Sequence, residues 1–138
     1  MSLLFKQLND GWNADPNAPG EQVSLIDGNL ILSFRLNWQA YDAQRRERGR
    51  LLFPGVRRFR LGPENDHAWF DGNGRYSGVA PQWGEFYEIS GEVEANLPTD
   101  GWVVVGEGGQ DGRHFLFFLR DTTFECFADD WSFERDRG

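Results

Sequence analysis

Hydrophobic and polar residues alternate along the segment NLILSFRLNWQAY, residues 29–41. Because successive side chains of a β-strand point to opposite faces, this alternation predicts a long strand with one buried face. Asp27 and Gly28, just before it, are typical of a tight hairpin turn, and residues 22–26 would form the other arm. The side chains predicted to face the core are those of Leu30, Leu32, Phe34, Leu36, Trp38 and Ala40.

A second long strand is predicted after an arginine-rich loop, and its register decides which side chains are buried. If the hairpin were centred near Arg46 and paired without interruption, Arg58 and Arg60 would lie opposite Phe34 and Leu32. That register would bury two cations, which is costly without partners.

A one-residue bulge at Pro54 and Gly55 would correct this register, because proline cannot donate to the ladder and glycine tolerates unusual backbone angles. The bulge moves Phe59 and Leu61 to the buried positions. Arg58 and Arg60 then share the outer face with Arg35, so we expect a bulged hairpin here.

The rest of the chain carries further strand patterns separated by turn-forming residues, and no helical period. The segment from Phe115 onward is apolar at successive positions, which predicts a strand covered on both faces. We therefore expect a single all-β domain over residues 1–138, an antiparallel β-barrel or β-sandwich of about eight to ten strands. The additional strand segments are 84–95, 101–107, 113–121 and 123–134.

The net charge of −8 opposes binding to nucleic acid, because such binding depends on cations that neutralise phosphates. The charge is unevenly distributed: residues 43–60 hold seven arginines and one acid, Glu47, whereas residues 61–138 hold sixteen acids and five arginines. Surfaces of opposite sign favour docking to a charged protein or to a second copy of the chain. The alternative is a solvated basic loop.

A cytoplasmic location is expected from the sequence. The only cysteine, Cys126, cannot form an internal disulfide, and the segment MSLLFKQLND lacks the apolar region of a signal peptide. The longest apolar run, residues 115–119, is far shorter than the ~20 residues that span a bilayer, so no membrane insertion is expected.

Residues 65–88 combine tryptophans, glycines and acids, and we interpret this segment as the main candidate for a binding surface. Trp69 and Trp83 are bracketed by turn residues, so their rings are better placed for a partner than for the core. Asp71 begins an Asp-x-Asn pattern that could start a calcium loop, but the far end of that loop is wrong and tight turns explain it better. Asn65 and Asp66 would cap a helical turn or close an Asx-turn.

Alternation along residues 84–95 sends Glu85 inward together with Tyr87. A buried carboxylate needs a partner, and Arg57 is the predicted one. The other acids of this segment favour a solvated outer face, although paired carboxylates for glycoside hydrolysis remain an alternative.

The sequence offers no spacing that points to a metal or a nucleophilic triad. His67, His114 and Cys126 are the only histidines and the only thiol, and no motif connects them. No cofactor is predicted.

These observations favour a non-enzymatic binding module whose partner is a protein or a second copy, with the loop 44–50 as a second contact. Two alternatives stay open: a small-molecule-binding β-barrel of lipocalin-like shape holding an amphipathic ligand, and a carbohydrate-binding or carbohydrate-processing protein that uses tryptophans and inward carboxylates. The predicted binding residues are Asn65, Asp66, Trp69, Asp71, Trp83, Glu85, Tyr87, Arg57, Arg58 and Arg60.

If Trp69 and Trp83 form a partner surface, Trp69→Ala or Trp83→Ala should weaken partner binding and leave the melting temperature nearly unchanged. Thermal unfolding and a binding titration of the same variants check this. A collapse in melting temperature would place the rings in the core.

Overall fold

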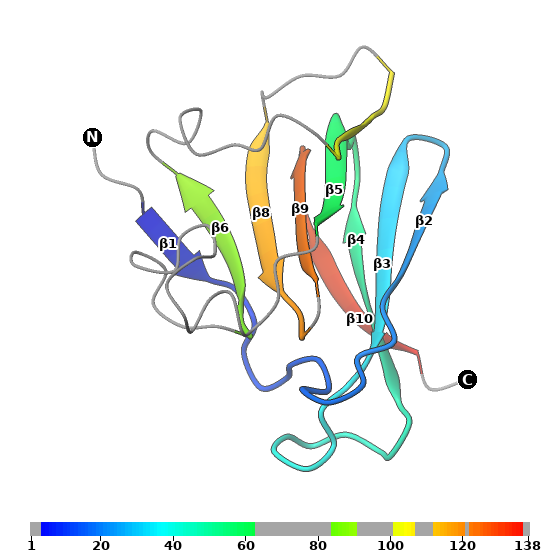
Figure 1. Ribbon diagram of the computed structural model, residues 1–138, viewed down its shortest axis with the longest axis vertical. Coiled ribbons are helices and arrows are strands. Elements are labelled where there is room, and N and C mark those ends of the chain that lie inside the picture. Colours follow the sequence, from blue (N-terminus) through cyan, green and yellow to red (C-terminus); the bar gives the residue numbers. More distant parts are fainter. Residues whose placement is uncertain (1–3, 63–83, 91–100, 107–111, 121, 137–138) are drawn as a thin grey trace.

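The computed structural model describes residues 4–62, 84–90, 101–106, 112–120 and 122–136. These residues form ten strands and no helix, and the strands make two antiparallel sheets with the orders β10-β4-β3-β2 and β1-β6-β8-β9-β5-β7 (Figure 1). The all-β prediction is confirmed, and the two sheets form a sandwich-like arrangement rather than a closed barrel. The strands are β1 Leu4–Gln7, β2 Gln22–Ile26, β3 Asn29–Arg35, β4 Arg48–Phe53, β5 Arg58–Gly62, β6 Phe86–Ser90, β7 Val103–Val104, β8 Arg113–Phe118, β9 Thr123–Ala128 and β10 Ser132–Asp136.

The predicted hairpin between β2 and β3 is confirmed. Ile26 pairs with Asn29, and the two turn residues between them have positive φ, 52° at Asp27 and 78° at Gly28. This is the conformation of the two-residue turns whose twist matches that of the flanking strands. The predicted alternation also holds within β3, where Leu30, Leu32 and Phe34 are fully buried.

The alternation does not extend to Trp38, and the prediction that its ring belongs to the core is wrong. β3 ends at Arg35, and Leu36 forms an isolated bridge with Ala14. Trp38 is 38% exposed, and the guanidinium of Arg45 lies 5.4 Å from the centre of its ring. Beyond Leu36 the chain is a loop, so a period of two no longer fixes which face a side chain takes.

The predicted bulged hairpin is also wrong. Phe34 lies opposite Gly49 of β4, whereas Phe59 lies in β5, which belongs to the other sheet and pairs with β9 and β7. Pro54 and Gly55 are the point at which the chain leaves one sheet for the other.

This crossing is fixed by contacts to a second crossing, between β9 and β10. The amide of Asp129 donates to the carbonyl of Pro54 at 3.0 Å, and the guanidinium of Arg57 pairs with the Asp129 carboxylate. Gly55 has a φ of 63°, and a side chain there would overlap the Asp129 carboxylate. The positive φ favours glycine at this corner, and a Cβ would displace the exposed Asp129 side chain from its place beside Arg57.

Aromatic rings fill the space between the sheets. Phe53 of β4 has its ring centre 5.3 Å from that of Phe115 and 5.5 Å from that of Phe124, both in the six-stranded sheet. Trp12 stacks on Phe133 at 4.0 Å with parallel rings. Such pairs contribute about 0.5–1.5 kcal/mol each beyond the burial of their surface.

The six-stranded sheet is buried on both faces at its centre. In β8, every residue from His114 to Phe118 is buried, which confirms the prediction of a strand covered on both sides. In β9, all six residues are buried as well.

Within the described part of the chain, no helix could span a membrane.

Replacing Gly55 by alanine should destabilise the protein by about 1–3 kcal/mol, because the positive φ costs about 1–2 kcal/mol and the added carbon would also displace the Asp129 carboxylate from Arg57. Gly11 provides a matched control: its φ is 76° but nothing lies within 4 Å of the added carbon, so Gly11→Ala should cost only about 1–2 kcal/mol. Urea unfolding of both variants measures the difference. Equal losses would mean that Asp129 does not restrict the corner.

Candidate functional site

Half of the predicted binding residues lie outside the part of the chain that the structure describes. The two tryptophans and the polar residues of the candidate surface belong to this group, so their role stays a prediction. They are Asn65, Asp66, Trp69, Asp71 and Trp83.

Glu85 and Tyr87 are both buried, at 8% and 1% exposure, but Phe86 is the residue of this segment that joins the core between the sheets, so the prediction that Glu85 and Tyr87 point inward holds only for their burial. The predicted pairing of Glu85 with Arg57 is wrong. Glu85 Oε2 accepts hydrogen bonds from the side-chain amides of Asn9 and Gln7, at 2.5 and 3.1 Å. Arg57 lies instead at the corner between the sheets.

Asn9 joins Glu85 to the N-terminal segment. Its Nδ2 also donates to the carbonyl of Trp12 at 3.1 Å, and its Oδ1 accepts from the amide of Phe86 at 3.1 Å. Burial raises the pKa of Glu85, and the hydrogen bond from Asn9 opposes this rise. The arrangement satisfies a buried carboxyl group and fixes the start of β6, so we assign Glu85 a structural role.

The prediction that Arg58 and Arg60 share a face with Arg35 is wrong, because β5 and β3 belong to different sheets. Arg58 and Arg60 occupy the face of the six-stranded sheet that points away from the ring-filled interior. The guanidinium of Arg58 lies 5.5 Å from the centre of the Trp102 ring, and Arg60 is buried at 6% exposure. Tyr87 lies on the same face, but β8 and β9 separate its strand from β5, so these residues do not converge on one site.

A buried acid and a buried histidine, not predicted from the sequence, lie beside these arginines. Glu125 is the cross-strand partner of Arg60, and its carboxylate contacts Nε2 of His114, whose ring stacks on Phe127 at 4.4 Å. Both side chains are at most 3% exposed. One signal could have revealed Glu125, because it is the only charged residue in the otherwise apolar strand TFECFA.

Glu88 of β6 has a cation as its partner. Arg113 makes two hydrogen bonds of 2.8 Å to the Glu88 carboxylate and one of 2.7 Å to Asp130. The hydrogen bonds from Arg113 lower the pKa of Glu88. This carboxylate is therefore engaged in an ion pair and does not face Glu85.

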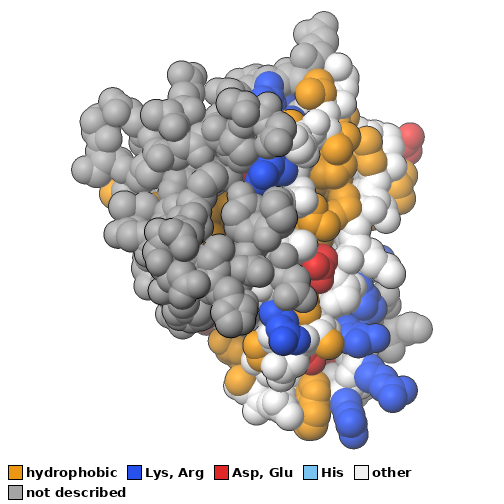
Figure 2. All heavy atoms as spheres, viewed as in Figure 1, with side chains coloured by type: hydrophobic (Ala, Val, Ile, Leu, Met, Phe, Trp, Pro, Cys, Tyr) orange, Lys and Arg blue, Asp and Glu red, His pale blue; other side chains and the backbone are white. Residues whose placement is uncertain are grey.

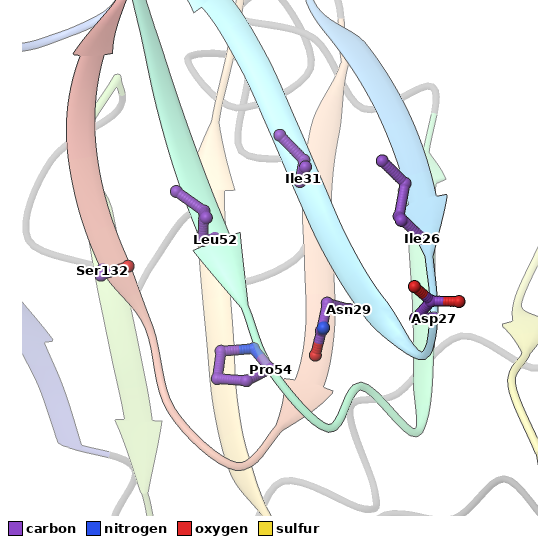
Figure 3. Close-up of a pocket in the computed structure, with 7 residues that line it drawn as sticks. All are labelled: Ile26, Asp27, Asn29, Ile31, Leu52, Pro54 and Ser132. Atoms are coloured by element: carbon purple, nitrogen blue, oxygen red, sulfur yellow. The ribbon is translucent and has the colours of Figure 1, made fainter.

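The solvent-facing side of the four-stranded sheet has an apolar hollow of about 330 Å³ (Figure 3). Ile31 and Leu52 form its floor as a cross-strand pair of β3 and β4. Their side chains point away from the interior, because Leu30, Leu32, Leu51 and Phe53, their neighbours in sequence, are fully buried. The hollow is lined by Ile26, Asp27, Asn29, Ile31, Leu52, Pro54 and Ser132.

The strand β2 borders this hollow and forms one edge of its sheet. Leu25 and Ile26 are 46% and 55% exposed. Among the described residues, β2 pairs with β3 alone. It contains none of the lysines, prolines or bulges by which edge strands avoid pairing with other chains.

The other end of the sheet is basic. Figure 2 shows Lys and Arg side chains gathered around the β3–β4 loop, and hydrophobic side chains gathered higher on the same side. The amide of Gln44 donates to the carboxylate of Glu47 at 2.8 Å, and the guanidinium of Arg135 lies 3.5 Å from that carboxylate. Glu47 is buried and thus holds the loop, whereas Arg45 and Arg46 are exposed.

Among the described residues, no three His, Cys, Asp or Glu side chains are grouped so that they could hold a metal ion. The chain matches no known protein family, no curated protein and no solved structure. The candidate site is therefore defined by its geometry, and that geometry points to the apolar hollow and the adjoining edge strand.

Glu88 of β6 and Glu85, the residue just before β6, should give pH effects of opposite sign. The folded-state pKa of Glu85 is raised above 4.5, so folding binds protons and the unfolding free energy falls as the pH rises through the window above 4.5. Glu85→Gln has no carboxyl group at this position, so its unfolding free energy should not show this fall. The unfolding free energy of the variant should therefore rise relative to that of the wild type as the pH rises above 4.5.

For Glu88 the folded-state pKa is lowered below 4.5, so its stabilisation is present above that value and is lost on acidification. Glu88→Gln should cost about 0.5–1 kcal/mol at neutral pH, and this cost should vanish at acid pH. Denaturant unfolding over a pH series checks both variants. The same pH trend in both would contradict the assignment.

Proposed function

We propose that this chain is a non-enzymatic protein-interaction module that docks through the outer face of its four-stranded sheet. One observation carries the proposal: Ile31 and Leu52 form an apolar floor on the face that points away from the filled interior. An antiparallel sheet with one buried face ordinarily carries polar residues on the other. An apolar hollow on the solvated face is typical of a surface that another molecule covers.

The surroundings of the hollow resemble the organisation of protein interfaces, in which an apolar centre is enclosed by a polar rim. Asp27, Asn29 and Ser132 lie at one end. Towards the other end, Arg50 of β4 pairs with Glu134 of β10. Covering an isoleucine or leucine side chain completely contributes up to about 1.5–3 kcal/mol, so a few such residues can sustain a specific contact.

The basic loop remains a proposed second contact. Arg45 and Arg46 are exposed, and Glu47 and Arg135 anchor the loop that carries them. Exposed cations beside an apolar surface would attract an acidic partner and would increase the association rate more than the affinity.

The two alternative functions have weaker support. A carrier with an internal ligand needs space between the sheets, and the described interior is filled by aromatic rings such as those of Phe53, Phe115 and Phe124. Glycoside hydrolysis needs two carboxylates that face each other, whereas Glu85 and Glu88 have separate partners, Asn9 and Arg113.

A photo-reactive benzophenone residue at position 31 tests the proposal in cells that make the protein. We expect illumination to join the probe at Ile31 covalently to a polypeptide. The same probe at Lys6, an exposed position on β1, is the control and should give no adduct. Adding Leu52→Lys should abolish the adduct at position 31 and change the unfolding free energy by less than about 1 kcal/mol.

Equal labelling at both positions, or no polypeptide adduct at position 31, would contradict the proposal. An adduct of only a few hundred daltons would also contradict it and would favour a small ligand in the hollow.

A further inference from the structure

We infer that the open edge of β2 pairs with β2 of a second copy of this chain, in antiparallel orientation and centred on Ser24. This inference rests on the proposed function and names the partner. The two four-stranded sheets would then form one continuous sheet across the dimer.

The hairpin turn determines which backbone groups of β2 are available. Ile26 and Asn29 flank a two-residue turn, and residues in these positions exchange both backbone hydrogen bonds. Hydrogen-bonded and non-hydrogen-bonded pairs alternate along an antiparallel ladder, so Ser24 and Gln22 also bond to β3. The N–H and C=O groups of Val23 and Leu25 therefore point to the open edge.

Self-pairing centred on Ser24 uses these backbone groups, and each side chain of β2 stays on the face of the sheet that it has in the single chain. Val23 of one copy lies opposite Leu25 of the other, twice by symmetry, and Ser24 lies opposite its own copy. Val23 packs against the core cluster, whereas Leu25 is 46% exposed. The contact would cover Leu25 with Val23 of the second copy, on the core side of the joined sheet.

The outer side of the same register also gains contacts. Ile26, which is 55% exposed and lines the hollow, would lie opposite Gln22 of the second copy. The stem of that glutamine would cover part of the isoleucine. The dimer contact is thus continuous with the hollow described above.

At the two ends of β2, this orientation brings acidic and basic side chains of the two copies close together. At the start, Gly20 accepts a 2.7 Å hydrogen bond from Arg48, and an added carbon at Gly20 would lie 3.9 Å from Nε of Arg35. At the other end, Asp27 is exposed. Antiparallel pairing brings Asp27 of one copy to this pair of guanidinium groups of the other. Glu21, the residue directly opposite Asp27, is also acidic and accepts a hydrogen bond from the Thr122 hydroxyl at 2.9 Å, so the two guanidinium groups would have to offset this like-charge pair.

Disulfide trapping of the full chain tests the register. Ser24 would form a non-hydrogen-bonded pair with its own copy, with the Cα atoms about 4.5 Å apart, which is within the range for a disulfide. Ser24→Cys should therefore cross-link rapidly under mild oxidation. The natural thiol of Cys126 is fully buried, and burial raises its pKa, so it should not compete. Val104→Cys, at 56% exposure on β7, is the matched control and should cross-link at least roughly tenfold more slowly.

Sedimentation equilibrium tests the association itself. The 15.9 kDa chain should reach twice this mass with rising concentration. Leu25→Lys places a charge on the open edge and should raise the dimer dissociation constant roughly tenfold or more. Val104→Lys, the same kind of change on the edge of the other sheet, should leave it unchanged. Circular dichroism and thermal unfolding should show that both variants are folded.

Three results would overturn the inference: a chain that stays at 15.9 kDa at its highest soluble concentration, equal effects of the two lysine variants, or preferential cross-linking through cysteine at position 23 or 25 instead of 24. If these results occurred while the probe at Ile31 still captured a different polypeptide, the self-pairing would be wrong and the proposed function would stand. If neither test gave a protein contact, both would fail.

Discussion

The architecture depends on the packing of aromatic rings between the two sheets. Phe53 contacts rings of the opposite sheet. The ring of Phe133, on which Trp12 stacks, lies directly over Gly49 of β4. A Cβ at position 49 would come within 2.7 Å of this ring, so the stacking depends on glycine there. These rings occupy the interior among the described residues. The apolar side chains that remain open to a partner there lie on outward faces and edges, and Ile31 and Leu52 of the hollow are two of them.

The sequence predicted local structure well and the association of strands poorly. The alternation around Leu32 and the turn at Asp27 depend on residues that are neighbours in sequence, so both can be predicted from the sequence. A period of two does not tell which sheet a strand joins, and the placement of Phe59 therefore failed. Trp38 failed for a related reason, because the strand ends three residues before it and the alternation continues by chance.

Part of the candidate site could also be predicted from the sequence. Ile31 and Leu52 stand at positions where a half-exposed strand ordinarily has polar residues, and this departure from alternation is visible in the sequence. The hydrogen-bond partners of Glu85 could not be predicted, because Asn9 lies seventy-six residues earlier in the chain. Long-range hydrogen bonds of this kind follow from the topology, which single-sequence patterns do not determine.

The corner that joins the sheets has a consequence for the order of folding during synthesis. The carbonyl of Pro54 bonds to the amide of Asp129, and β4 has β10 as its neighbour on one side. The ribosome delivers β2, β3 and β4 early, but β4 keeps an unpaired edge until β10 emerges. A nascent chain therefore carries an open, apolar three-stranded sheet for most of its synthesis. Contacts so distant in sequence form slowly, so this interval is when the chain most needs protection from aggregation.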